Sequence, residues 1–206
     1  MAKNSSKLVI LITGTMTAGK AALKYFLVDK GFKYIRHTDP ILQEGLSKKI
    51  DMKKRENWIK VLVDMRKRDG NEVLSKLADE KVKDGDRFVI CPIRHPEDIK
   101  YFKKRYNTII IFIDAPFDIR YKRTFLKEMG STLTKEEFKK KDDKENNPNG
   151  IDKEYLPNIN ECRKLADHII NNDSSLNDLN KDLEDFLRSK GITALIDTGA
   201  YDDFEM

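Results

Sequence analysis

An α/β fold, with a parallel sheet covered by helices on both faces, is predicted by three observations. Short apolar runs alternate along the chain with amphipathic segments of about ten to fifteen residues. The runs are apolar almost throughout, as in strands that are buried on both sides of a sheet. The chain has 206 residues, enough for one domain with a modest insertion. Alternation of this kind requires crossover connections and therefore predicts parallel strands.

The first third of the chain has a clear strand–helix rhythm. Residues 7–13 (KLVILIT) predict the first buried strand. The helix that follows has apolar residues at i, i+3 and i+4 spacing and is expected to end at Gly31. A short strand is expected over 32–35. Asp39 and Pro40 then begin another helix, because an acid at the N-cap and a proline in the first turn are typical helix starts.

The same rhythm continues to the last helix. Further strands are expected at residues 87–91, 108–114 and 167–171. Amphipathic helices are expected over 54–68 and 72–83, from Pro96 onward, and from Ser175 to Gly191. The predicted sheet therefore has five strands.

Residues 127–157 interrupt this rhythm. They are highly charged, contain no strand pattern, and include the turn-rich sequence NNPNG at 146–150. The capping-box spacing of Thr134 and Glu137 predicts a short helix through Lys144. We expect a helical insertion over the edge of the sheet, within a single domain that spans residues 1–191.

The charge distribution favours anionic ligands. The net charge is +5, but residues 192–206 carry four acids and no base, so residues 1–191 carry +9. A basic body of this kind suits phosphate compounds or nucleic acid. The alternative is a lysine-rich surface kept for solubility, and composition alone favours that alternative. The last residues form an expected short acidic tail.

Cellular context follows from what the sequence lacks. No apolar run approaches the ~18 residues needed to span a bilayer, and the start has no signal-peptide cleavage pattern. Cys91 and Cys162 are too far apart to suggest a metal site, and His37, His95 and His168 share no ligand spacing. We therefore expect a cytoplasmic protein with reduced cysteines, no membrane association and no metal ligands among these residues.

The strongest motif is GTMTAGK at residues 14–20, directly between the first strand and the first helix. Glycines in this context let backbone N–H groups turn toward phosphate oxygens, and the helix N-terminus adds a favourable dipole. Lys20 would reach the terminal phosphates. A glycine-rich turn without a ligand is the alternative. We expect nucleotide phosphates to bind at Gly14, Thr15, Thr17, Ala18, Gly19, Lys20, Ala21 and Ala22.

Further along the chain, other short segments follow this loop in a characteristic order. They are 31–35, 38–39, Arg55, 65–70, 93–97, 114–123, 142–145, 158–167 and 172–175. In this order residues 7–188 resemble the P-loop kinases of the nucleoside-monophosphate-kinase superfamily, in particular dephospho-coenzyme A kinases and deoxynucleoside monophosphate kinases. The resemblance implies a three-layer P-loop NTPase fold, ATP as cofactor, a small-molecule nucleotide as partner, and a lid at 127–157 that closes to exclude water.

The resemblance also implies roles on the acceptor side of the site. Arg66 and Arg94 fall where such kinases bind the acceptor's phosphate, a task that suits the guanidinium fork. Arg55 belongs to the same substrate-binding set. Asp39 falls at a carboxylate that orients the acceptor. Taken alone, Arg66 could instead complement the dipole of its helix end, and Asp39 could be only a cap.

Three further positions correspond to the nucleotide side. Arg120 and Arg123 fall at the lid arginines, which neutralise charge on the transferring phosphoryl group. Their i, i+3 spacing is also common for surface charges on one helix. Asn172 falls near the loop that contacts adenine.

Two departures from the family concern magnesium. Ala21 and Ala22 follow Lys20, where a hydroxyl residue usually helps to hold the ion. Cys91 stands where relatives carry an acid at the end of the third strand, and a thiol is a poor ligand for this hard cation. Magnesium could still be held through Asp39, Asp114 or the ligand's own phosphates.

Three functional hypotheses result. The first is a kinase that moves the γ-phosphoryl group of ATP to a phosphate-bearing, nucleotide-like acceptor, with Lys20, Arg94, Arg120, Arg123 and Asp39 as its catalytic residues. The second is a degenerate kinase that binds a nucleotide and acts as a sensor or docks to a protein partner. A nucleic-acid binder is the least favoured, because no aromatic platform or helix-turn-helix pattern is present.

Overall fold

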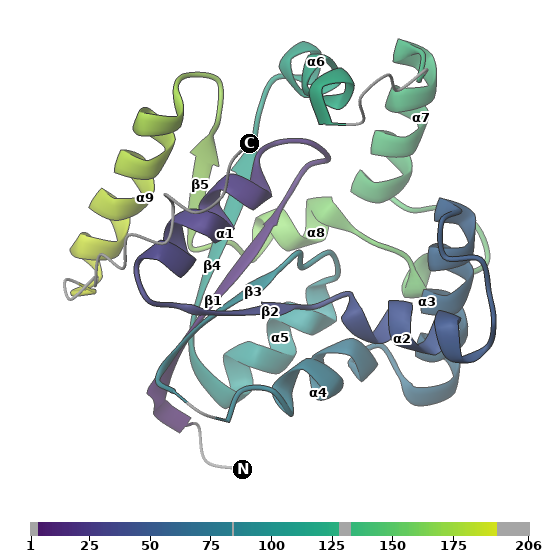
Figure 1. Cartoon of the computed structure of the whole chain (residues 1–206), viewed down its shortest axis with the longest axis horizontal. Helices are drawn as coiled ribbons and strands as arrows, with labels where there is room; N and C mark the ends of the chain where they lie inside the picture. Colours follow the sequence, from purple (N-terminus) through teal and green to yellow (C-terminus); the bar gives the residue numbers. More distant parts are fainter. Residues whose placement is uncertain (1–3, 84, 128–132, 193–206) are drawn as a thin grey trace.

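Figure 1 shows the computed structural model, which describes residues 4–83, 85–127 and 133–192. Its five strands are β1 (Asn4–Gly14), β2 (Lys33–Arg36), β3 (Arg87–Cys91), β4 (Tyr106–Asp114) and β5 (His168–Asn171). They form one sheet in the order β2-β3-β1-β4-β5, and every pairing is parallel. The predicted five-stranded parallel sheet is confirmed.

Helices connect the strands as the sequence predicts. They are α1 (Lys20–Asp29), α2 (Asp39–Ser47), α3 (Arg55–Asp69), α4 (Val73–Asp79), α5 (Pro96–Arg105), α6 (Phe117–Lys127), α7 (Lys135–Asn146), α8 (Ile159–Lys164) and α9 (Leu176–Ser189), with a short 3-10 turn η1 (Lys153–Tyr155). One detail differs from expectation, because Thr38 is the N-cap of α2 and Asp39 is its first helical residue.

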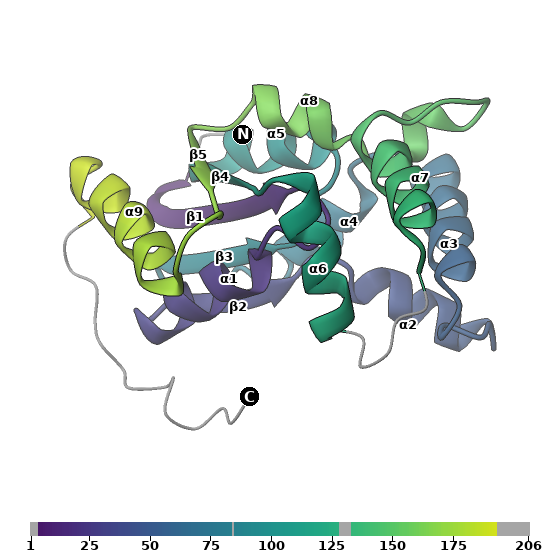
Figure 2. The same ribbon diagram turned by 90° about the horizontal axis from the view of Figure 1, so that it is seen from above.

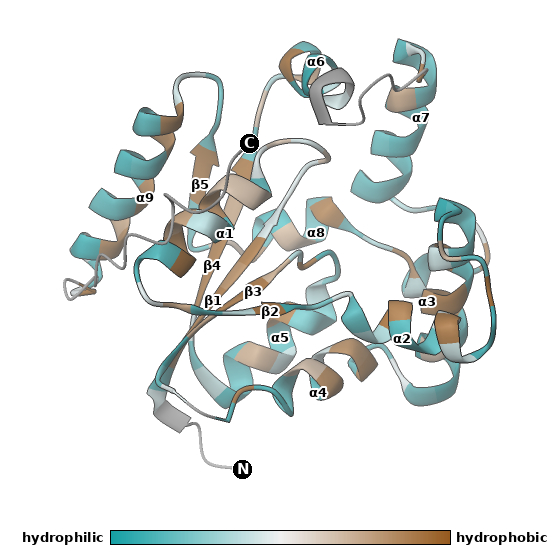
Figure 3. Ribbon diagram, in the orientation of Figure 1, coloured by the Kyte–Doolittle hydropathy of each residue, from teal (hydrophilic) through white to brown (hydrophobic). Residues whose placement is uncertain are grey.

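The sheet has a separate apolar core on each face. Alternate residues of β1 pack into the two cores, because neighbouring side chains of a strand point to opposite faces of the sheet. Ile10 and Ile12 pack in the core beneath α1 and α9. Val9 and Leu11 pack in the core that α4, α5 and α8 cover. Figure 2 shows α1 and α5 on opposite sides of the strands, and Figure 3 shows apolar strands enclosed by helices with polar outer faces.

A third apolar cluster lies to one side of the sheet. Residues of α2, α3 and α4, among them Ile41, Val61 and Leu74, pack together there. This cluster packs the three helices together and holds α2 and α3 beside the carboxyl ends of the strands (Figure 1).

The insertion contains the predicted helix. Thr134 and Glu137 form the expected capping box at the start of α7. Phe138 is fully buried and its ring contacts those of Phe117 and Tyr121 in α6. The described part of the insertion therefore packs as a second helix beside α6, above the same edge of the sheet (Figure 1). The acids expected in the C-terminal tail lie outside the described residues.

Candidate functional site

Residues 14–20 form the turn between β1 and α1 and have unusual backbone angles. The φ angles are 142° at Gly14, 57° at Thr17 and 112° at Gly19. A Cβ atom at Gly14 would overlap the carbonyl oxygen of Ile113, and one at Gly19 would overlap the amide of Asn172. Both ends of the loop therefore require glycine. The N–H groups of Thr15 and Ala18 already donate to the carbonyl oxygens of Ile113 and Thr15. The loop ends at the N-terminus of α1, where an anion is favoured.

Three neighbouring segments hold the loop in this shape. Thr15 Oγ1 donates to Asp114 Oδ1 at the end of β4, at 2.7 Å. Thr17 Oγ1 donates to the carbonyl oxygen of Arg120 in α6, also at 2.7 Å. Asn172, in the turn after β5, donates from Nδ2 to the carbonyl oxygen of Ala18 at 2.8 Å. The side chain of Asn172 thus stabilises the loop through a hydrogen bond to its backbone.

Lys20 folds back over the loop. Its Nζ donates to the carbonyl oxygens of Gly14 and Thr15, at 2.8 and 2.6 Å. The next two residues differ in orientation, since Ala21 is exposed whereas Ala22 packs against the core beneath α1. Neither alanine has a side-chain oxygen to offer a ligand, and the N–H of Ala22 already donates to the carbonyl oxygen of Gly19 at 3.0 Å.

The loop opens into a cleft of about 550 Å³ between α1, α3 and α7. Its walls include Thr17, Trp58 and Phe138. Among the described residues that line it, every charged side chain is basic: Lys20, Arg36, Lys53, Arg55, Arg94 and Lys141. A cleft with this lining attracts polyanions, because charges of one sign in a concave site reinforce one another.

Arg94 and Arg55 lie in the wall of this cleft and share a carboxylate. Glu145 of α7 accepts from Arg94 Nη1 at 3.0 Å and also pairs with Arg55. Burial and the nearby charge of Arg55 lower the pKa of Arg94 to about 10. The predicted acceptor-side arginines Arg55 and Arg94 are therefore brought together.

Arg66, the third expected phosphate ligand, is more deeply buried than Arg55 and Arg94. It is 2% exposed, and its Nη2 donates to Asp98 Oδ2 at 2.9 Å while Nη1 donates to the carbonyl oxygen of Tyr155. Arg66 does not line the large cleft, but it borders a small cavity of about 70 Å³ that Arg94 also lines. Asp98 also accepts from Ser75 at 2.7 Å, and His37 lies 3.5 Å away. These contacts make Arg66 part of a buried polar network.

Asp39, the expected acceptor-side carboxylate, faces other partners. Its carboxylate lies 3.4 Å from Lys81 Nζ and 3.7 Å from Arg36 Nε. Asp39 does not line the cleft, although the preceding Thr38 does. In this conformation the Asp39 carboxylate pairs with Arg36, and Arg36 lines the cleft.

The two expected lid arginines hold the loop. Arg120 is 6% exposed and forms a two-pronged ion pair with Asp142 of α7, at 2.7 and 2.8 Å. It also donates to the carbonyl oxygens of Met16 and Ala115. Arg123 donates to the carbonyl oxygens of Ala18 and Asn172, at 3.3 and 2.9 Å. Both side chains thus lie against the backbone of the loop.

The surroundings of the loop contain few ligands for a divalent cation. The Cys91 side chain is buried in the core beneath α1. Asp114 already accepts from Thr15, from the N–H of Ala115 and from Arg163. Within residues 4–83, 85–127 and 133–192, no group of three or more His, Cys, Asp and Glu side chains is arranged to hold a metal ion.

None of the described helices is long and apolar enough to cross a membrane.

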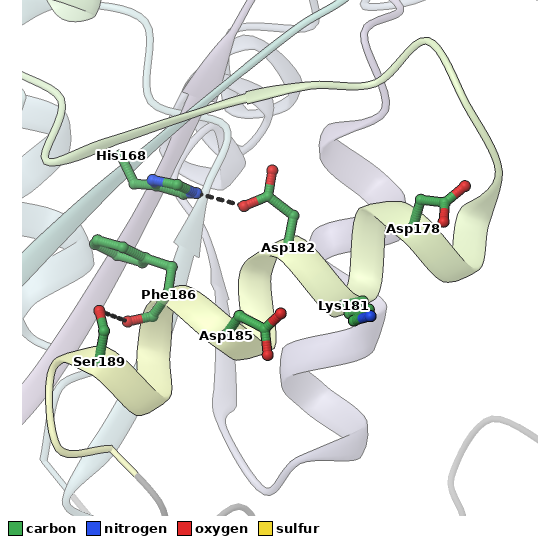
Figure 4. A pocket seen from close by; sticks show the side chains of 7 residues that line it. All are labelled: His168, Asp178, Lys181, Asp182, Asp185, Phe186 and Ser189. Atoms are coloured by element: carbon green, nitrogen blue, oxygen red, sulfur yellow. Dashed lines mark hydrogen bonds and ion pairs between the residues drawn. The ribbon is translucent and has the colours of Figure 1, made fainter.

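A second hollow lies on the outer surface of α9 (Figure 4). His168 pairs there with Asp182 at 2.7 Å and stacks on Phe186, with ring centroids 4.1 Å apart. The other charged side chains that line it are Asp178, Lys181 and Asp185. This mainly acidic lining is unsuited to phosphate, so the cleft beside the loop is the better candidate.

Several cleft residues could not be recognised in the sequence. Lys53, Lys141 and Trp58 belong to charged or amphipathic segments that resemble ordinary helix surfaces. Asp142 and Glu145 lie three residues apart, as do many surface acids on helices. Their role depends on arginines more than twenty residues away, and no local pattern reports such pairs.

Sequence comparison identifies a well-covered relative of the chain. No family model matches the chain. A UPF0200 protein from Sulfurisphaera tokodaii is 30% identical over 181 residues, which cover 87% of this chain and 96% of the relative.

Solved structures of kinases have the same fold. Shikimate kinase from Acinetobacter baumannii has a TM-score of 0.54 at 14% identity, covering 92% of this chain and 97% of that chain. Dephospho-CoA kinase from Campylobacter jejuni has a TM-score of 0.50 at 18% identity, covering 90% and 98%. The fold is therefore that of P-loop kinases, as predicted.

The buried network around Asp98 gives a prediction about stability. Burial alone would raise the pKa of Asp98, but His37 and Arg66 outweigh it and hold the pKa well below its usual range. Asp98→Asn leaves the charge of Arg66 buried without its partner. We expect a loss of roughly 3–5 kcal/mol in the free energy of unfolding at pH 7, measured by urea denaturation.

The pair of Asp98 and Arg66 also determines how the free energy of unfolding changes with pH. Because the folded-state pKa of Asp98 is lowered, its stabilisation is complete above the unfolded-state pKa of about 4 and is lost as the pH falls below it. The stability difference between the two proteins should therefore shrink toward pH 3. The exposed acid Asp118, which pairs with Lys135, provides the control, and Asp118→Asn should change stability little. Equal stability of Asp98→Asn and the unmodified protein at pH 7 would contradict a structural role for Arg66.

Proposed function

The chain belongs to the UPF0200 family, and we propose that it is an ATP-dependent phosphotransferase that acts on a phosphate-bearing, nucleotide-like acceptor. The observation that carries this proposal is the opening of the glycine loop into a cleft whose charged lining residues are all basic. The loop suits the phosphates of ATP, because its glycines with positive φ angles lead into the N-terminus of α1, where anions are favoured. ATP supplies the γ-phosphoryl group.

The arrangement of cations supports a second phosphate in the cleft. Lys20 lies at the loop, whereas Arg55 and Arg94 come from α3 and from the turn after β3. Cations on both sides of one cleft can hold two anionic ligands and neutralise their mutual repulsion, which transfer between them requires. We therefore propose a nucleoside monophosphate or a dephospho-coenzyme A type compound as acceptor.

The residues have distinct proposed roles. Lys20 exchanges the carbonyl oxygens of Gly14 and Thr15 for phosphate oxygens. Arg94 and Arg55 bind the acceptor's phosphate. Arg120 and Arg123 keep the loop in shape, and Arg120 can neutralise the transferring group only after it separates from Asp142. Asp39 orients the acceptor side through Arg36.

The scarcity of magnesium ligands among the described residues around the loop favours a second candidate function. Ala21 offers no hydroxyl, Cys91 is buried in the core, and the contacts of Asp114 with Thr15 and Arg163 are already made. The residues present do not fit a magnesium site at the loop, so we assign no step to that ion. A chain that binds the nucleotide but transfers phosphate slowly could act as a nucleotide sensor or dock to a protein partner.

Calorimetry with ATP tests the binding claim. Lys20→Ala removes the cation that faces the terminal phosphates, and we expect ATP affinity to fall at least about tenfold. Lys100→Ala, which removes an equal charge from a lysine that pairs with Glu97 on α5, is the matched control and should bind ATP like the unmodified protein. If neither the unmodified protein nor the control binds ATP, with or without magnesium, both candidate functions are wrong.

Turnover separates the two candidates. Product formation from ATP should be measured with a panel of nucleoside monophosphates and with dephospho-coenzyme A. Transfer to any member of the panel supports the phosphotransferase. Tight ATP binding without transfer to any of them supports the sensor.

A gain-of-function variant tests the metal argument. Ala21→Thr places a hydroxyl at the exposed position beside the loop, and we expect magnesium to increase ATP affinity about tenfold more than in the unmodified protein. Ala22→Thr is the matched control, because position 22 packs against the core and should gain nothing. An unmodified protein whose ATP affinity already rises strongly with magnesium would show that other groups hold the ion.

A further inference from the structure

Glu145 occupies the position that an acceptor phosphate would need. The proposed phosphate ligands, Arg94 and Arg55, both pair with its carboxylate, through Nη1 of Arg94 at 3.0 Å. Guanidinium groups bind carboxylates and phosphates with the same N–H donors. A phosphate that binds through the same N–H donors must displace Glu145.

The exposure of the three side chains indicates that such an exchange is feasible. Glu145 is 8% exposed, but its partners Arg55 and Arg94 are 42% and 33% exposed. Both arginines stay accessible to a ligand from the cleft. By contrast, the side chains of the Arg66–Asp98 pair are 2% and 1% exposed, so that pair is closed to ligands.

A third hollow lies on the other side of this bridge. It measures about 430 Å³ and is bordered by α3, α7 and the segment around residues 148–157. Ile59, Pro148 and Leu156 give it apolar walls. Its charged lining is mixed: Arg55, Lys141 and Lys144 with Glu56 and Glu145. Arg55, Ile59 and Lys141 line both this hollow and the cleft, so the two spaces adjoin where Glu145 meets Arg55.

We propose that Glu145 is a specificity-determining residue that competes with the acceptor's phosphate for Arg55 and Arg94. A phosphomonoester that displaces it places its phosphate on these arginines and the rest of the molecule in the adjoining hollow, against Ile59 and Leu156. Ligands without a dianionic group cannot displace the carboxylate and are excluded. This inference rests on the proposed function, because it names how the acceptor of that reaction is selected.

Binding of two simple probes to the full-length protein tests the proposal. Glu145→Gln keeps the shape of the side chain and removes its charge. We expect the affinities for inorganic phosphate and for AMP, measured by calorimetry without ATP, to rise about tenfold. Asp143→Asn removes the same charge from the same helix, at an exposed residue that pairs with Lys139, and should change either affinity less than about twofold. Unchanged or weaker binding by Glu145→Gln overturns the proposal.

Hydrogen exchange in the unmodified protein gives a second readout if the variant does not fold. Saturating AMP should accelerate exchange of the backbone amides at residues 142–146, because Glu145 loses the contacts that fix the end of α7. Slower or unchanged exchange there, with AMP bound, contradicts the proposal.

The two proposals fail in different ways. If the unmodified protein transfers phosphate from ATP but Glu145→Gln binds AMP no better, the competition is wrong and the proposed function stands. If Glu145→Gln binds AMP more tightly but no ATP binds, the competition stands at an anion site that does not serve an ATP-dependent reaction.

Discussion

The loop of residues 14–20 curls at the N-terminus of α1 into the cradle that we propose for the phosphates, and the rest of the site depends on that conformation. Two glycines with positive φ angles are needed for it. Even so, an isolated loop of this kind would sample many shapes, and ordering each residue costs about 1–2 kcal/mol. Hydrogen bonds from the ends of β4 and β5 and from α6 offset this cost. Loss of any of these contacts would misdirect the N–H groups without touching the ligand.

Arginine–carboxylate pairs organise the space above the loop. Three arginines in and around the cleft each pair with an acid of the chain itself: Arg66 with Asp98, Arg94 with Glu145, and Arg120 with Asp142. The first and third pairs are deeply buried, and breaking such a pair leaves a charge without a partner in a medium of low polarity. They behave as part of the framework. The pair of Arg94 and Glu145 differs because Arg94 still faces the cleft, so a ligand can exchange with the carboxylate.

Local patterns predicted what depends on local interactions. The strand at 7–13 and the capping box of Thr134 and Glu137 were readable because the deciding pattern lies within a few residues. The glycine loop was readable from its residue spacing, although the hydrogen bonds that hold its shape come from distant segments. The assignments of Asp39 and Arg66 depended on a resemblance. In the structure, Asp39 contacts Lys81 and Arg66 contacts Asp98, partners that are 42 and 32 residues away. The partners of a charged side chain are set by the packing of distant helices, and one sequence does not encode that packing in any short pattern.

The most direct test of the central claim is a spectrum of the protein labelled with ¹⁵N only at its ten glycines, recorded before and after addition of ATP. The N–H groups of Gly14 and Gly19 should respond strongly, because they lie in the cradle. Gly191, which follows the C-terminal end of α9, serves as the reference signal and should respond much less. If ATP binds while the signals of Gly14 and Gly19 stay fixed, the phosphates bind elsewhere and the cradle is not the nucleotide site.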